Sequence, residues 1–220
     1  MSELSGRIGY GIIGFGGIAE NRIAKEGFCA DKSRFQDHPE AELIGVTDLN
    51  PARRKAAENL GLSWYDSPEE LLTDPAISAV FIATNNASHG AITEKSLEAG
   101  KHCVVEKPIA TTLEEANKLQ TLAKKKKLSL MVDHMMVHNV FNRKASDMIS
   151  QGEIGEVNDI CTHMEFLYGS TPEEAASWRC SKPEELGGPI GDVACHCFYM
   201  AEFLLQDTIA SLSCVYLPQT

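Results

Sequence analysis

Residues 10–19 read Tyr-Gly-Ile-Ile-Gly-Phe-Gly-Gly-Ile-Ala and follow an apolar run that begins at Ile8. The glycines have the G-x-G-x-x-A spacing of a loop that joins a buried strand to a helix and binds a dinucleotide. Gly14 permits the tight turn, Gly16 lets the backbone approach a pyrophosphate, and Ala19 keeps the helix close to the sheet. The N–H groups at the helix start bind the phosphates. We therefore expect a cofactor-phosphate loop formed by Gly14, Phe15, Gly16, Gly17 and Ile18.

The first part of the chain alternates short apolar runs with longer helical patterns, which is typical of β-α-β units that build a parallel sheet. The apolar runs are nearly continuous, as in strands buried on both faces. They cover residues 8–13, 41–47, 79–83, 102–105 and 128–132. Helical patterns cover residues 51–60, 89–99 and 113–126, the last after the cap candidates Thr111 and Thr112. This pattern predicts an α/β fold, a Rossmann doubly wound parallel sheet, over residues 1–133.

Asp48 ends the second apolar run. A carboxylate there accepts hydrogen bonds from the adenosine ribose hydroxyls and repels a 2′-phosphate, which favours NAD and leaves NADP as the alternative. Asp48 lies further from the glycines than is usual, which indicates an extended first helix or an insertion around residues 26–38. Arg53 and Arg54 either face a 2′-phosphate or are exposed charges on a helix, and the second interpretation describes the commoner case.

Two further apolar runs end in polar residues at the same expected edge of the sheet. Thr84, Asn86 and His89 follow one run, and we expect them beside the nicotinamide half of the cofactor. Lys107 follows the next run and precedes Pro108, which can hold the turn rigidly, including through a cis bond. The Lys107 ammonium can hydrogen-bond a substrate hydroxyl and stabilise the alkoxide character that develops as hydride leaves. We expect Lys107 to be catalytic; a surface lysine after a strand is the alternative.

The pattern changes after Asp133. A helix is predicted at residues 140–150, strands at 156–167 and 209–217, and a helix between these strands that ends near Leu205. We expect a second domain at residues 134–220, of α+β type. Two strands are few for an independently stable domain.

Asp192 and His196 stand four residues apart in Gly-Gly-Pro-Ile-Gly-Asp-Val-Ala-Cys-His, residues 187–196. On a helix this spacing places them on one face. His196 can take a proton from a carbinol as general base, and Asp192 can orient the imidazole or hold a substrate hydroxyl. A buried structural histidine capped by an aspartate is the alternative. No metal site is predicted, because His134 and His138 lack partners at ligand spacing and Cys195, His196 and Cys197 point in different directions on a helix.

Composition narrows the class of partner. The net charge of −11 disfavours nucleic acid and anionic membranes, and there is no apolar stretch of bilayer-spanning length and no signal-peptide pattern at the N-terminus. The seven cysteines form an odd set without a C-x-x-C pair, which favours reduced thiols. We expect a cytoplasmic protein that binds a small molecule.

The ordered motifs resemble those of the Gfo/Idh/MocA oxidoreductases, named for glucose-fructose oxidoreductase and inositol dehydrogenase. The similar stretches are GIIGFGGIA, VTD, VFIATNNASH, LEAGKHCVVEKPIA and GGPIGDVACHCFYMA, of which A-G-K-H-x-x-x-E-K-P is the most specific. The resemblance implies NAD(P)-dependent oxidation or reduction of a sugar, cyclitol or related polyol. It matches Lys107, Asp192 and His196 to catalytic positions, includes Glu106 with Lys107 among the cofactor contacts, and suggests Arg179 as a substrate contact. It also implies a second domain with an open antiparallel sheet that is often used in homo-oligomer contacts. Family members continue with further strands of this sheet, so we expect a second domain truncated at its C-terminal end. A reduced protein that covers its exposed edge by association is the alternative.

Two other functions stay open at this point. One is an NAD-dependent glycosidase, in which transient oxidation of the sugar by bound NAD activates it for elimination. The other is a non-catalytic, NAD-sensing regulator on the same scaffold. Retention of Lys107 and His196 argues against the sensor, which needs neither residue.

Overall fold

A computed structural model describes residues 6–165 and 167–215 of the chain. By its internal contacts the chain divides into two compact units, residues 1–133 and 134–220.

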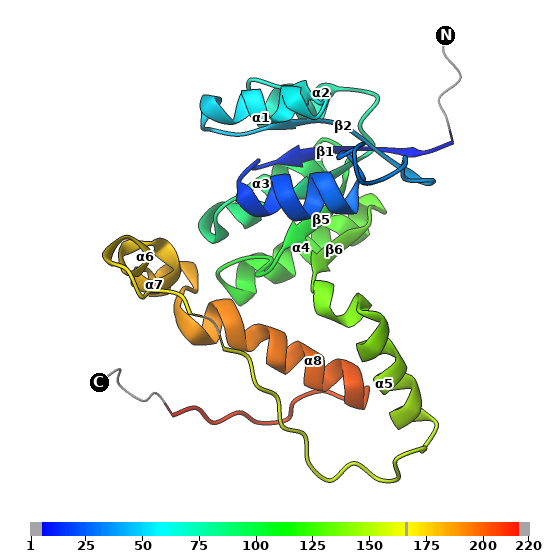
Figure 1. The fold of residues 1–220 in the computed structure, drawn as a ribbon, viewed down its shortest axis with the longest axis vertical. Helices are drawn as coiled ribbons and strands as arrows, with labels where there is room; N and C mark the ends of the chain where they lie inside the picture. The colour runs from blue at the N-terminus through cyan, green and yellow to red at the C-terminus, as the bar shows by residue number, and fades with distance from the viewer. Residues whose placement is uncertain (1–5, 166, 216–220) are drawn as a thin grey trace. The chain divides into compact units, whose positions relative to one another are not determined.

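The first unit is built on a parallel sheet of six strands in the order β3-β2-β1-β4-β5-β6 (Figure 1). The strands are β1 (Ile8–Ile13), β2 (Ala41–Thr47), β3 (Ser63–Trp64), β4 (Ala79–Ile82), β5 (His102–Glu106) and β6 (Leu130–Asp133). All five predicted strands are present, and the predicted α/β class with a parallel sheet is confirmed. The order places β1 between β2 and β4, so the strand order reverses at the carboxyl end of β1, where α/β sheets bind ligands.

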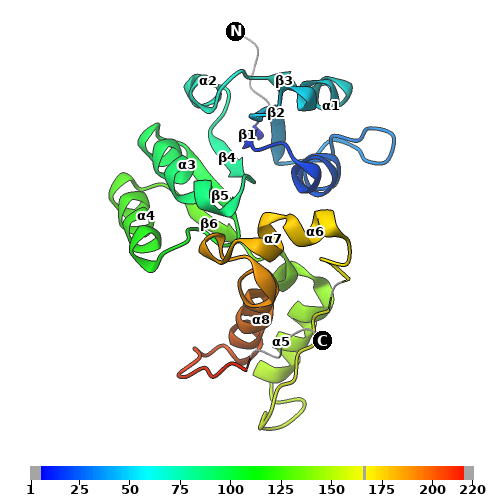
Figure 2. The ribbon, with the colours of Figure 1, turned by 90° about the vertical axis from the view of Figure 1, so that its left-hand side faces the viewer.

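Helices cover both faces of this sheet (Figure 2). They are η1 (Ala19–Gly27), η2 (Pro51–Arg53), α1 (Arg54–Asn59), α2 (Pro68–Thr73), α3 (Asn86–Glu98) and α4 (Leu113–Lys126). Neighbouring residues of β1 show the two-sided packing: Ile13 packs with α2, α3 and α4, whereas Ile12 packs with η1 and α1. Both side chains are essentially buried, because successive residues of a strand point to opposite faces.

The first helix differs from a regular α-helix. Residues 19–27 are π-helical, and the chain then runs irregularly through residues 28–40 before it enters β2. The N–H of Phe28 donates to the carbonyl of Ile23, five residues earlier, as π-helical geometry requires. The wide spacing between the glycines and Asp48 therefore comes from an irregular insertion rather than from a longer helix.

The second unit is helical in the residues that the structure describes. Its elements are η3 (Met135–His138), α5 (Val140–Ser150), α6 (Pro172–Ala176), α7 (Trp178–Ser181), η4 (Pro183–Glu185), η5 (Pro189–Ala194) and α8 (Cys195–Leu205). Helices α5 and α8 pack together, and the Ser146 hydroxyl donates to the carbonyl of Phe203 at 3.4 Å.

The two predicted strands of this unit are wrong for the residues that the structure describes. Residues 156–165 and 167, and residues 209–215, form no strand; the predicted ends at 166 and 216–217 lie outside the described part. The expected open antiparallel sheet is accordingly not formed over these segments. A strand exists only through hydrogen bonds to a neighbour, and neither segment pairs with one in the described chain.

Candidate functional site

The glycine loop stands at the carboxyl end of β1. Gly14 has a positive φ of 90°, and a Cβ there would lie 2.7 Å from the carbonyl oxygen of Ala83, so the fold itself requires glycine at this position. Gly16 and Gly17 are different, because a Cβ on either would meet nothing within 4 Å. Glycine at those two positions leaves room over the loop, and the helix that follows begins with N–H groups that lack a carbonyl one turn earlier. These residues fit a bound pyrophosphate.

The Phe15 and Ile18 side chains lie in different surroundings. Phe15 is fully buried in the core on the η1 side, so only its backbone can face a cofactor, whereas Ile18 is half exposed. Residue 15 can therefore contribute only backbone groups to the expected phosphate loop.

Asp48 closes the glycine loop onto the end of β2. Its carboxylate accepts hydrogen bonds from the Phe15 N–H at 2.6 Å and from the Asn50 N–H at 2.8 Å. An ionised carboxylate has about four acceptor positions, so these two bonds leave capacity for ribose hydroxyls. Asp48 thus joins the end of β2 to the glycine loop through the Phe15 N–H.

Arg53 belongs to the same corner. Its Nε donates to the Phe15 carbonyl at 2.6 Å, its guanidinium lies 5.7 Å from the centre of the Phe15 ring, and it forms an ion pair with Glu20 of η1. Lys25 binds the other oxygen of Glu20 at 2.6 Å. Hydrogen bonds from Lys25 first, and also from Arg53, hold the pKa of Glu20 below its ordinary value against the effect of burial. Arg54 is exposed and pairs with Glu58, so the exposed-charge interpretation applies to Arg54 and not to Arg53.

The loop after β4 is joined to the turn after β5 through His89. One ring nitrogen lies 2.7 Å from the Pro108 carbonyl and the other 3.2 Å from the Thr84 carbonyl, and the side chain is buried. Burial lowers the pKa of His89 and outweighs these two hydrogen bonds, which favour the charged form. His89 thus ties the two loops together from inside the unit, and its ring nitrogens face the protein. Asn86 is buried beside it at the start of α3, while Thr84 receives a hydrogen bond from Ser88.

Lys107 immediately follows Glu106, the last residue of β5. The Lys107–Pro108 peptide bond is cis, as the sequence allowed. Because β5 pairs with β4 and β4 with β1, the Lys107 turn, the Thr84 loop and the glycine loop follow three neighbouring strands at one edge of the sheet. This edge of the first unit brings together the predicted cofactor and catalytic residues that the unit contains.

The second unit holds the other predicted residues. Asp192 lies in η5 and His196 in the first turn of α8. Arg179 of α7 donates from one nitrogen to both carboxylate oxygens of Asp192, each at 2.9 Å, and its guanidinium lies 4.6 Å from the centre of the Trp178 ring. The structure therefore joins Arg179 to Asp192, a pairing that nothing in the sequence indicated, because the two stand thirteen residues apart in an irregular segment.

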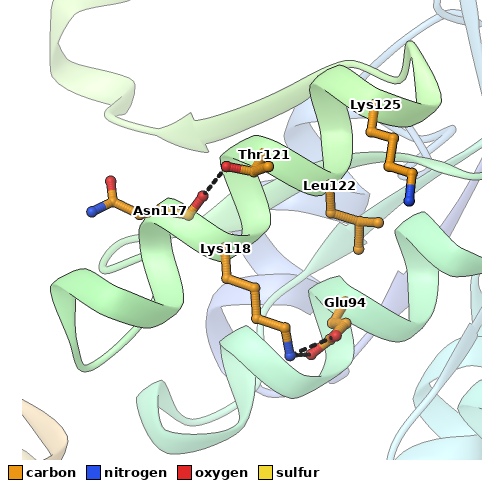
Figure 3. Close-up of a pocket in the computed structure, with 6 residues that line it drawn as sticks. All are labelled: Glu94, Asn117, Lys118, Thr121, Leu122 and Lys125. Carbon is orange, nitrogen blue, oxygen red and sulfur yellow. Dashed lines mark hydrogen bonds and ion pairs between the residues drawn. The ribbon is translucent and has the colours of Figure 1, made fainter.

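A groove of about 360 Å³ lies between α3 and α4, lined by Glu94, Asn117, Lys118, Thr121, Leu122 and Lys125 (Figure 3). An ion pair of 2.7 Å between Lys118 and Glu94 spans it. No cluster of three or more metal-ligating side chains occurs among residues 6–165 and 167–215. Within the same residues, helices fall short of the length and apolar character needed to cross a membrane.

Comparison with known proteins identifies both parts of the chain. Residues 8–134 match the profile of the oxidoreductase family with an NAD-binding Rossmann fold, Gfo/Idh/MocA, and residues 142–219 match a C-terminal domain of the same family.

Curated relatives are similar over much of the chain. It is 34% identical over 142 residues to 1,5-anhydro-D-fructose reductase of Ensifer adhaerens, covering 64% of this chain and 41% of the relative. It is 32% identical to D-xylose 1-dehydrogenase (NADP⁺) of Hypocrea jecorina, covering 84% and 49%. It is 30% identical to scyllo-inositol 2-dehydrogenase (NAD⁺) of Bacillus subtilis, covering 87% and 54%. The chain thus spans about half the length of these relatives.

Solved structures show the same likeness. An NAD-binding protein from Listeria innocua has a TM-score of 0.69 and 28% identity, covering 90% of this chain and 55% of that one. The 3-ketoreductase KijD10 of Actinomadura kijaniata, in complex with NADP, has a TM-score of 0.59 and 28% identity, covering 68% and 46%.

Proposed function

The chain belongs to the Gfo/Idh/MocA oxidoreductase family, and from this premise we propose that it transfers hydride between a nicotinamide cofactor and a carbinol carbon of a sugar, cyclitol or related polyol. One observation carries the proposal. The glycine loop, the Thr84 loop and Lys107 follow the neighbouring strands β1, β4 and β5 at a single edge of the sheet. A dinucleotide seated on the loop would therefore extend toward the lysine.

NAD(P) would supply the hydride acceptor or donor, and the chain's own residues supply position and charge. Backbone N–H groups at Gly16, Gly17 and Ile18 hold the pyrophosphate, and Asp48 holds the adenosine ribose. Thr84, Asn86 and Glu106 border the nicotinamide half. His89 joins the two loops at this edge, because its ring nitrogens contact the Thr84 and Pro108 carbonyls.

Lys107 is the proposed electrostatic catalyst. Its ammonium donates a hydrogen bond to the substrate oxygen and stabilises the negative charge that develops there as the carbinol hydrogen leaves as hydride. His196 is the proposed general base that takes the hydroxyl proton. Asp192, with Arg179 bound to both of its oxygens, is the proposed substrate-hydroxyl contact. In the reducing direction the same groups return the proton.

The test measures binding and turnover separately. Affinities for NAD⁺ and NADP⁺ are obtained by calorimetry, and nicotinamide absorbance is followed against a panel of sugars, cyclitols and polyols. Lys107→Ala should lower kcat by about 100-fold and change the NAD⁺ affinity by no more than about threefold, because the lost charge acts on the transition state. Lys118→Ala is the matched control, since Lys118 pairs with Glu94 in the groove between α3 and α4.

Three outcomes contradict the proposal. Full activity of Lys107→Ala removes the catalytic role of that lysine. NAD⁺ binding without turnover across the panel indicates a sensor. Cleavage of glycosides with no net formation of NADH indicates a glycosidase.

We also propose that the protein is a cytoplasmic homo-oligomer. The seven cysteines are free thiols, which suits a reducing compartment. Val140 and Phe141 of α5 are 72% and 79% exposed, and self-association would cover such apolar surface. Sedimentation velocity tests the oligomeric state, and a monomer at all concentrations would contradict the homo-oligomer. Cell fractionation tests the cytoplasmic location.

A further inference from the structure

Arg53 is partly buried and bound to two other residues of the first unit. From the sequence, Arg53 is interpreted either as an exposed charge or as a contact of a 2′-phosphate. In the structure its side chain is 27% exposed, Nε donates to the Phe15 carbonyl at 2.6 Å, and Nη2 pairs with Glu20. Arg54, the next residue, keeps a side chain that is 55% exposed.

The position of Arg53 is set by the same residue that positions Asp48. The Phe15 N–H donates to Asp48 and the Phe15 carbonyl accepts from Arg53. An acid and a cation from the segment that follows β2 therefore both bind the backbone of Phe15. In Rossmann folds the acid in this place binds the ribose hydroxyls of NAD, and a nearby arginine accommodates the 2′-phosphate of NADP. Arg53 is the candidate for that arginine, because it hydrogen-bonds the glycine loop at the Phe15 carbonyl.

Glu20 already supplies Arg53 with an anion. Its side chain is only 18% exposed, and Lys25 binds its second oxygen at 2.6 Å, so it is anchored from both sides. The hydrogen bonds from Lys25 and Arg53 lower the pKa of Glu20. A 2′-phosphate would have to displace this carboxylate from Arg53, and it would bring further negative charge close to Glu20 and Asp48.

We propose that Glu20 is a specificity-determining residue that occupies Arg53 with an internal ion pair and thereby makes the site select NAD⁺ over NADP⁺. The inference rests on the proposed binding of a nicotinamide dinucleotide. It assigns selectivity to a residue of the first helix in addition to the acid at the end of β2.

The experiment measures dissociation constants for NAD⁺ and NADP⁺ by calorimetry at one ionic strength, with no substrate present. In Glu20→Gln, Arg53 is released, so the Kd for NADP⁺ should fall about tenfold while that for NAD⁺ changes by less than about twofold. Glu26→Gln is the matched control. Glu26 is also a glutamate of η1, paired with Arg22 at 2.8 Å and Arg34 at 3.4 Å, and its loss removes the same charge from the same helix. In this control, the ratio of the dissociation constants for NAD⁺ and NADP⁺ should equal the wild-type ratio.

The double variant Glu20→Gln with Arg53→Gln separates the ion pair from a general change of charge. The gain in NADP⁺ affinity should disappear, since no released guanidinium remains. Glu20→Ala is measured in parallel and should behave as Glu20→Gln, and circular dichroism melts show that each variant is folded.

Retention of the NADP⁺ gain in the double variant, or an equal shift for both cofactors in Glu20→Gln, overturns the inference. These failures are distinct from failure of the proposed function. A wild-type chain that binds neither dinucleotide removes the premise, whereas one that binds NAD⁺ but keeps its selectivity in both Glu20 variants removes only the role of Glu20.

Discussion

His89 is a residue whose burial makes stability depend on pH. It is buried, and burial lowers its pKa from the ordinary value of 6.5. The folded chain therefore keeps His89 neutral at pH values where the unfolded chain takes up a proton. The contribution is fully present above about pH 6.5 and is lost as the pH falls toward the lower folded pKa.

The free energy of unfolding, measured with urea between about pH 7.5 and 5.5, should therefore decrease as the pH falls. His89→Gln should flatten this part of the profile. His163→Gln is the control, because the His163 side chain is 78% exposed and its loss should leave the slope unchanged. An unchanged slope in His89→Gln would refute the assignment.

Gly14 and Gly16 serve different purposes: the fold requires glycine at residue 14, and the expected ligand requires it at residue 16. An alanine at residue 14 would have a φ near 90° and a Cβ 2.7 Å from a backbone oxygen, so Gly14→Ala should lower the free energy of unfolding by about 2 kcal/mol. Gly16→Ala meets no protein atom within 4 Å and should keep its stability but bind NAD⁺ less tightly. Urea unfolding and calorimetry measure the two effects. Equal loss of stability in both variants would contradict this division.

Among the elements, α4 shows how a single capping residue determines where a helix begins. Thr112 precedes the helix with extended backbone geometry, and its side chain accepts a hydrogen bond from the Glu115 N–H at 3.2 Å. Thr112→Ala should therefore cost about 1 kcal/mol of stability. Thr121→Ala is the control, because Thr121 is exposed within the helix and alanine suits that position better. Urea unfolding of both variants checks this, and equal effects would exclude a capping role for Thr112.

The elements also show where local signals were insufficient. The short elements β3 and α2 were not predicted, and two residues of strand are too few to show a period. Residues 156–167 and 209–217 have strand-like patterns, but the described parts of these segments lack a pairing partner. Strand formation depends on that partner, which the pattern of one segment does not specify.

For the molecule as a whole, the two units differ in how much of their chain is buried in a hydrophobic core. The buried members of both hydrophobic clusters lie within residues 12–123. Of the described residues from 134 onward, four are buried: Val137, Ser146, Glu185 and Met200. The first unit therefore holds the apolar surface that stabilises a cooperative fold.

Residues 1–133 produced alone should consequently unfold in one cooperative transition and bind NAD⁺ with the affinity of the whole chain. In the whole chain, amide hydrogen exchange should be slow in β1, β4 and β5 and fast in residues 156–165 and 207–215, which lack ladder hydrogen bonds. An unfolded fragment, or equal protection in these segments, would contradict this difference between the units.

The sequence alone predicted five of the six strands of the first unit's sheet and its glycine loop, but not β3. Apolar runs, cap residues and the spacing of Gly14, Gly16 and Ala19 act through neighbours along the chain, so they can be read without coordinates. It also placed Asp48, Thr84 and Lys107 after strands, and parallel strands bring such residues to one edge.

Which of these side chains contact one another depends on the three-dimensional fold. Glu20 and Arg53 stand 33 residues apart, as do Phe15 and Asp48, and His89 reaches the carbonyl of Pro108 across 19 residues. No local pattern specifies such partners, because they come together only when the crossover connections place loops from different strands at the same edge. The ion pair that holds Arg53, and with it the proposed choice of cofactor, arises from that three-dimensional arrangement.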